Sequence, residues 1–166
     1  MNPIHPPSGL KQLIQSEEAE WKAFFKSLRE IPATEVDLMV LPVAEEVTKK
    51  TDCRTCANCC TILDAGLSEE EIQTMAGLQQ REVQEFTENE TATEPGTNIV
   101  FLKRKPCIFL NGCDCSIYPH RPEGCVDFPG FGRKQIKFRL RRFIEHMEIC
   151  PIIYNTFNIL RQQAAR

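Results

Sequence analysis

The stretch DCRTCANCC, residues 52–60, carries four cysteines within eight residues: Cys53, Cys56, Cys59 and Cys60. If this stretch is helical, a turn of 100° per residue places the four side chains within an arc of about 120°. If it is a loop, the C-x2-C spacing is the one that wraps thiolates around a single ion in zinc and iron–sulfur sites. Both geometries predict metal binding, and the adjacent pair Cys59 and Cys60 indicates either two ions or one spare thiol.

Five further cysteines follow, which brings the total to nine. They are Cys107, Cys113, Cys115, Cys125 and Cys150. The first residues have no apolar segment typical of a secretory signal, so we expect a cytoplasmic protein whose thiols stay reduced. Tetrahedral zinc takes four ligands, so nine thiols exceed one site and suffice for two. The alternative is that some of them are small buried apolar residues or free thiols.

The composition is that of a globular protein, with 166 residues, 42% hydrophobic and 26% charged. This length predicts one domain with a core of its own. The apolar runs are far shorter than the roughly 20 residues of a membrane-spanning helix, so we expect no membrane partner. Residues 1–102 carry 8 Lys and Arg against 18 Asp and Glu, whereas residues 103–166 carry 12 against 5. The two halves either attract each other within the fold or leave a basic face for an anionic partner.

Helices are predicted over most of the chain. Apolar spacing of three and four predicts one amphipathic helix over residues 10–31 and another over 35–50. Ser68 and Glu71 form a capping box, which predicts a helix from residue 69, followed by a short helix over residues 79–89. A last helix is expected after Cys150 and Pro151.

Strands are predicted in two short segments. Residues 98–102 are rich in β-branched and aromatic side chains, and residues 134–140 alternate between apolar and polar. The basic segment 133–142 also fits a nucleic-acid-binding strand, but a core face with solvated charges is the simpler interpretation. Residues 103–132 are rich in Gly, Pro and Cys and are expected to be irregular.

These patterns together predict a small α-rich α+β fold. Its helices would surround an irregular, cysteine-lined metal-binding centre with one or two short strands. Residues 1–50 are expected to form an N-terminal helical extension and residues 51–166 a cysteine-cluster domain, the two making one compact unit.

Four stretches resemble the YkgJ-type cysteine-cluster proteins, the CxxCxxCC family to which zinc or iron chelation is ascribed. They are DCRTCANCC at 52–60, PCIFL at 106–110, CSIYPHRPEGCVDFP at 115–129 and ICP at 149–151. The resemblance implies eight metal ligands, namely Cys53, Cys56, Cys59, Cys60, Cys107, Cys115, Cys125 and Cys150. It implies zinc or iron as the cofactor, the iron either as an ion or in an iron–sulfur cluster. Cys113 lies outside the family's usual set.

The resemblance supplies no reaction. A flagellin lysine methylase shares the cysteine pattern, so the alternative is an iron–sulfur or metal-dependent enzyme of redox or group-transfer chemistry. The sequence shows no G-x-G-x-x-G, P-loop, G-x-S-x-G or H-E-x-x-H motif, and it identifies no catalytic residue. His120 and His146 are candidate substitute ligands, and Arg121 is a candidate to neutralise thiolate charge. The partner that we expect is therefore the metal ion.

Overall fold

The computed structural model describes residues 8–165 and divides the chain into two compact units. Unit 1 takes the described residues up to Cys56 and those from Pro129 onward, and unit 2 is Ala57–Phe128. The chain therefore crosses from one unit to the other inside the DCRTCANCC stretch and again after Phe128. The four cysteines of that stretch are therefore divided, with Cys53 and Cys56 in unit 1 and Cys59 and Cys60 in unit 2.

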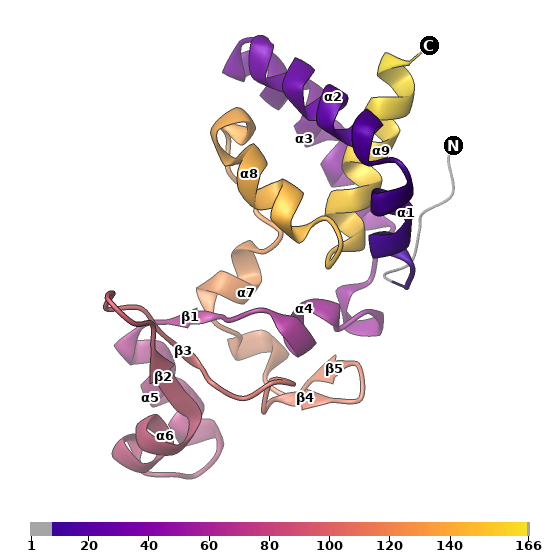
Figure 1. The fold of residues 1–166 in the computed structure, drawn as a ribbon. Helices are drawn as coiled ribbons and strands as arrows, with labels where there is room; N and C mark the ends of the chain where they lie inside the picture. The colour runs from indigo at the N-terminus through magenta and orange to yellow at the C-terminus, as the bar shows by residue number, and fades with distance from the viewer. Residues whose placement is uncertain (1–7, 166) are drawn as a thin grey trace. The chain divides into compact units, whose positions relative to one another are not determined.

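Unit 1 is helical. Its elements are α1 (Leu10–Ser16), α2 (Glu18–Glu30), α3 (Ala33–Lys49), the 3-10 turn η1 (Cys53–Thr55), α8 (Ile136–His146) and α9 (Pro151–Ala164). Helix α3 contacts both α8 and α9, and Figure 1 shows α3 and α9 running alongside each other. Because α9 is buried over most of its length, it forms the centre of this unit.

Aromatic side chains from three helices build the core of unit 1. The ring of Phe157 on α9 lies 5.1 Å from that of Phe25 on α2 and 5.6 Å from that of Phe143 on α8. Trp21 and Tyr154 lie 5.6 Å apart by the same measure. Such tilted pairs add to the free energy gained by burying the rings. This packing joins the two segments of chain that form unit 1. In the sequence, the whole of unit 2 lies between these two segments.

The strand predicted over residues 134–140 is wrong, because residues 136–140 form the start of α8 and residues 134–135 precede it. Ile136, Leu140 and Phe143 are buried, with spacings of four and three, while Phe138 is 74% exposed. Residues four apart share a helix face, so Ile136 and Leu140 fit either periodicity over a short window. Asp37 on α3 decides the outcome locally, because its carboxylate accepts hydrogen bonds from the backbone N–H groups of Gln135 and Ile136, at 2.8 and 2.9 Å.

The other helical predictions for unit 1 agree with the structure in type, with one break. The single helix expected over residues 10–31 is interrupted at Glu17, where the backbone leaves helical geometry. The polar run before Trp21 gives this point no apolar face to bury. Helix α3 accommodates Pro42 in its interior, and α9 begins with Pro151 at its first position, where a missing N–H costs nothing.

Unit 2 consists of short helices and short antiparallel strands. Its elements are α4 (Asn58–Ile62), β1 (Gly66–Leu67), α5 (Glu69–Leu78), α6 (Val83–Glu90), β2 (Thr91–Thr93), β3 (Val100–Leu102), β4 (Leu110–Asn111), β5 (Asp114–Cys115), η2 (Tyr118–His120) and α7 (Glu123–Asp127). Strand β3 pairs with β1 on one side and β2 on the other, and β4 pairs with β5 in a separate hairpin. The predicted α-rich α+β fold class is confirmed, although the described residues form five short strands rather than the expected one or two.

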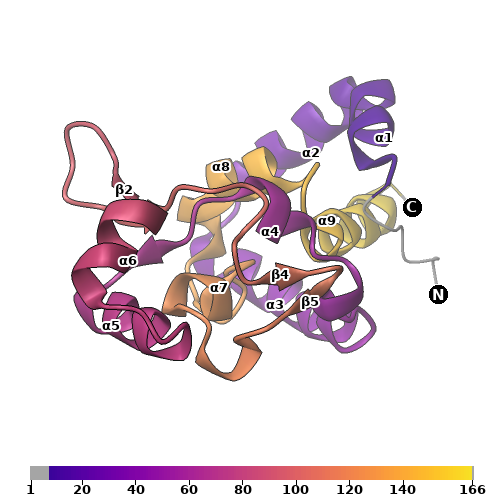
Figure 2. The same ribbon diagram turned by 90° about the horizontal axis from the view of Figure 1, so that it is seen from below.

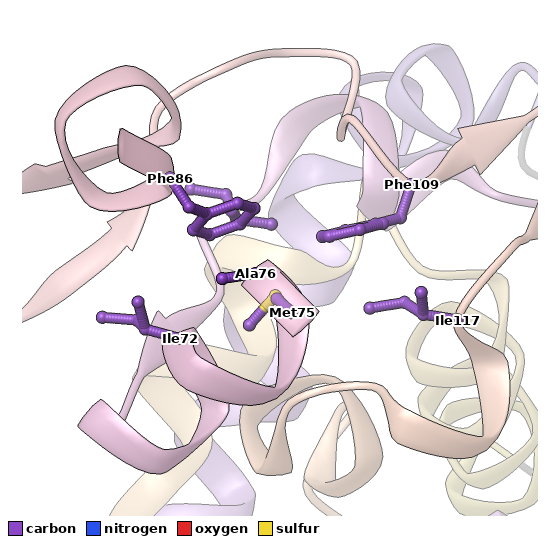
Figure 3. Close-up of a cluster of buried hydrophobic side chains, with 7 residues drawn as sticks. Ile72, Met75, Ala76, Phe86, Phe109 and Ile117 are labelled. Atoms are coloured by element: carbon purple, nitrogen blue, oxygen red, sulfur yellow. The ribbon is translucent and has the colours of Figure 1, made fainter. Parts of the chain in front are cut away.

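The capping box at the start of α5 is present as predicted. The Ser68 hydroxyl accepts from the backbone N–H of Glu71, and the Glu71 carboxylate accepts from that of Ser68. Seven buried side chains then form the core of unit 2. They are Ile72, Met75, Ala76, Phe86, Leu102, Phe109 and Ile117. Figure 3 shows those from α5, α6 and the loops around the β4–β5 hairpin, and Leu102 adds the end of β3. Among the described residues, no helix is both long and apolar enough to cross a membrane.

A substitution at Phe86 tests how much this small core contributes to the stability of unit 2. Its side chain is fully buried, and its ring stacks with that of Phe109 at 6.4 Å. We expect Phe86→Ala to lower the free energy of unfolding by about 3–5 kcal/mol, because it leaves a cavity in the buried cluster of unit 2. Val83→Ala, on the exposed side of the same helix, is the control and should cost less than about 1 kcal/mol. Chemical denaturation measures both, and equal losses would contradict the assignment of the core.

Candidate metal centre

Helix α4 holds the first two thiols of unit 2. The chain turns into it at Ala57, which takes the left-handed conformation with φ of 52° and whose carbonyl accepts from the N–H of Cys60 at 3.0 Å. Cys59 and Cys60 follow one another on this short helix, and their sulfur atoms are 3.9 Å apart. Both side chains are half-buried, so the two sulfurs lie together at the surface of the unit.

The next two thiols come from the β4–β5 region. The backbone N–H of Cys107 donates to the carbonyl of Cys60 at 2.8 Å, which fixes this segment against α4. Cys107 also precedes β4, and Cys115 lies on β5, opposite Leu110. Figure 2 shows α4 beside the hairpin. Cys107 and Cys115 both pack against the hydrophobic cluster, so the core of unit 2 holds the two thiols in place.

A further thiol of this group, Cys125, lies on α7. The backbone N–H of Glu123 at the start of this helix donates to the Glu71 carboxylate at 2.6 Å. The same carboxylate completes the capping box of α5 through its other oxygen. Glu71 therefore ties the beginnings of two helices together, and one of them carries Cys125.

The five thiols just described influence one another's ionisation, and Cys60 differs from the rest. The hydrogen bond from Cys59 lowers the pKa of Cys60 to about 6, and the positive charges of Lys105 and Arg121 act in the same direction. Burial is the main reason that the pKa of Cys125 is raised to about 11, although the residue as a whole is exposed, and the charge of Cys60 acts in the same direction. Burial and the neighbouring thiolates also raise the pKa values of Cys107 and Cys115. One thiolate is thus favoured at neutral pH, and each further one is opposed.

Two cations lie beside these thiols. The sequence indicates Arg121, whose charge acts on Cys60, Cys115 and Cys125. Lys105 was not anticipated, although its position two residues before Cys107 is visible in the sequence; it acts on Cys60 and Cys107 and pairs with Asp64 at 2.9 Å. Positive charge of this kind stabilises thiolates, which are the form of cysteine that binds metals.

Unit 1 contains a second, smaller group of thiols. Cys53 opens the η1 turn, and Cys56 follows it with its N–H donating to the Cys53 carbonyl at 3.2 Å. Cys150 is buried at the residue that precedes α9. Burial is the main reason that its pKa is raised to about 12; the charges of Cys53 and Cys56 act in the same direction, while backbone N–H groups of the first turn of α9 oppose the rise.

The remaining candidates lie apart or carry less information. Cys113 is exposed in the turn between β4 and β5, after Gly112 with its φ of 62°. His120 is exposed at the end of η2, and His146 is half-buried at the last residue of α8. The backbone carbonyl of His146 accepts from the N–H of Cys150 at 2.9 Å.

The donor set fits the metals implied by the sequence, because several thiols of unit 2 converge from three elements. Thiolate sulfur is the ligand of structural zinc and of iron–sulfur clusters. The buried Nε of Arg121 has no hydrogen-bond partner in the described structure, which suits a site where sulfur is to accept. Within residues 8–165, no three Cys, His, Asp or Glu side chains are already arranged as a ligand set. Coordination would therefore require the cysteine side chains to rotate towards a common point.

Comparisons with known proteins identify one family. Its model, described as "CxxCxxCC: Putative zinc- or iron-chelating domain", matches residues 52–151, more than half of the chain. Comparison with curated proteins and with solved structures gave no match. The matched range begins at the residue before Cys53 and ends at the residue after Cys150, so it contains all nine cysteines.

The contrast between Cys60 and Cys125 leads to a prediction for the metal-free protein. Thiolate, not thiol, reacts with iodoacetamide, so Cys60 should be alkylated before Cys125 at pH 7. Because the folded-state pKa of Cys60 is lowered to about 6, its alkylation rate should be near its plateau at pH 7 and fall as the pH drops through 6. Peptide mass spectrometry after limited alkylation measures the order. A rate at Cys60 that still rises steeply between pH 8 and 9 would contradict it.

Proposed function

Because the chain belongs to the CxxCxxCC family, we propose that it is a cytosolic metal-binding protein that chelates zinc or iron through cysteine thiolates. Iron could be held as a single ion or in an iron–sulfur cluster, because both use the same four-thiolate ligation as zinc. The cytosol keeps thiols reduced, and reduced thiols are the state in which these nine are available to a metal.

One observation carries the proposal. In unit 2, the charge of Cys60 raises the pKa values of Cys107, Cys115 and Cys125, so these three thiols lie within electrostatic reach of Cys60. Bringing several ionisable groups of one sign together opposes their ionisation unless a counter-charge is present. A bound cation reverses this effect, since it favours the thiolate at every ligand. We propose these four residues as the ligands of the principal centre.

The other cysteines complete the proposed set of eight. Cys53, Cys56 and Cys150 form the group in unit 1, which supplies three thiols for a second ion. Cys59 lies against Cys60 and provides an additional sulfur in unit 2. The metal in the principal centre would cross-link α4, the β4–β5 hairpin and α7. Hydrogen bonds otherwise tie α4 to Cys107 and α7 to Glu71. We therefore expect metal removal to lower the thermal stability of the protein.

A pair of matched variants tests the ligand assignment. Cys125→Ser removes a proposed ligand, and Cys113→Ser makes the same chemical change at the exposed turn residue. We expect Cys125→Ser to lower the metal content per chain of freshly purified protein, whereas Cys113→Ser should leave it at the wild-type level. Elemental analysis measures the content, and an absorption spectrum separates colourless zinc protein from brown iron–sulfur protein.

Two results would overturn the proposal. One is a wild-type protein that is folded but contains no zinc or iron when purified without chelators. The other is a Cys113→Ser variant that loses as much metal as Cys125→Ser, since the exposed turn would then be equivalent to the grouped thiols.

A further inference from the structure

Arg121 occupies an unusual position beside the thiols of unit 2. It lies in the chain between η2 and α7, hence between Cys115 and Cys125. Its guanidinium carbon is 3.8 Å from the centre of the Tyr118 ring, so the ring holds one face of the group. Its Nε is buried and has no hydrogen-bond partner among the described residues. A buried donor without an acceptor calls for an explanation. The Nε of Arg161 in unit 1 is also unpaired, but the other nitrogens of Arg161 bind Glu17 and Glu20.

Three other cations of unit 2 pair with carboxylates. Arg81 and Arg104 both bind Glu90, each at 2.8 Å. Lys105, the second cation beside the thiols, pairs with Asp64. No carboxylate in the described part of the chain pairs with Arg121. The groups on which its charge acts are instead the thiols of Cys60, Cys115 and Cys125, of which Cys60 is the one favoured as a thiolate without metal.

We infer that Arg121 is a positioning residue of the principal metal centre, where its guanidinium compensates thiolate charge and its Nε–H donates to a sulfur atom of the loaded site. This inference rests on the proposed function. Four thiolates around a divalent ion leave a net charge of −2, and a guanidinium fixed against them reduces it. Sulfur is a weak acceptor when neutral but a better one as a thiolate, so the unpaired donor gains its partner when the metal binds.

The test uses Co²⁺ as the probe, added to the full metal-free chain, because its thiolate complexes absorb through sulfur-to-metal charge transfer. Arg121→Gln removes the charge and the Nε donor. Arg104→Gln is the matched control, since it removes one arginine of the same unit whose side chain is 60% exposed and whose partner Glu90 keeps Arg81. Arg121→Lys keeps the charge but loses the Nε donor.

We expect Arg121→Gln to weaken Co²⁺ binding by about tenfold or more, the usual effect of losing a group that supports metal ligands. Its charge-transfer band should move to longer wavelength, because thiolate electrons are held less tightly without the neighbouring cation. Arg104→Gln should bind within about threefold of wild type with an unshifted band. Arg121→Lys should bind with an affinity between those of the wild type and Arg121→Gln, and circular dichroism checks that each variant is folded.

The band position separates a role at the sulfur atoms from a general loss of stability, which would not shift it. If Arg121→Gln binds Co²⁺ as tightly as wild type with the same band, the inference is overturned. Equal weakening by Arg104→Gln overturns it as well, because any arginine of the unit would then serve. If Arg121→Gln does not fold, an Arg121→Lys variant with wild-type affinity and band overturns the role of the Nε donor. A wild-type chain that takes up no Co²⁺ would instead overturn the proposed function itself.

Discussion

Thiols that are both crowded and desolvated resist losing their protons, and this constraint applies to the cysteines of unit 2. Cys107 and Cys115 pack against the apolar cluster of unit 2, and burial is the main reason that their pKa values rise. Each of them stands two residues before a core side chain, Phe109 and Ile117 respectively. The packing that buries those two side chains therefore also brings the thiols to the edge of the core. If these thiols bind the metal as proposed, stability and metal affinity would be linked through the same segments.

The positive charges of Lys105 and Arg121 act on the ionisation of the thiols of unit 2. Cys60 is the thiol whose ionisation is favoured before any metal arrives, because Cys59, Lys105 and Arg121 surround it. An entering cation would meet this thiolate first and then lower the cost of ionising the neighbouring thiols. Arg121 differs from Lys105 in this scheme, because Asp64 already shares the charge of Lys105. The ring of Tyr118 holds the arginine without neutralising it.

Signals confined to a few neighbouring residues could be predicted from the sequence. The capping box at Ser68 and the proline that opens α9 act within one turn, and both are in the structure. The segment 134–140 could not be assigned in this way. Its alternation spans too few residues to separate a strand from the buried face of α8, and Asp37, nearly a hundred residues earlier, fixes the start of that helix. A local sequence pattern cannot predict a contact between residues so far apart in the chain.

The grouping of the cysteines shows the same limit. Spacing marks Cys53, Cys56, Cys59 and Cys60 as one motif, but the structure places the first two in unit 1 and the last two in unit 2. Cys150 lies near Cys53 and Cys56 because α9 packs against α3 in the same unit, and this follows from helix packing rather than from any motif. The effect of Lys105 on the pKa of Cys60 could likewise not be predicted from the sequence. It depends on the hydrogen bond between Cys107 and Cys60, which holds the chain before β4 against α4.

The central claim is that cysteine sulfur atoms, and not nitrogen or oxygen donors, surround the bound metal. X-ray absorption spectroscopy of the purified protein, recorded at the edge of whichever metal elemental analysis identifies, tests it most directly. The account predicts a first coordination shell made of sulfur, at about 2.3 Å if the metal is zinc. A shell dominated by nitrogen or oxygen at about 2.0–2.1 Å would contradict it.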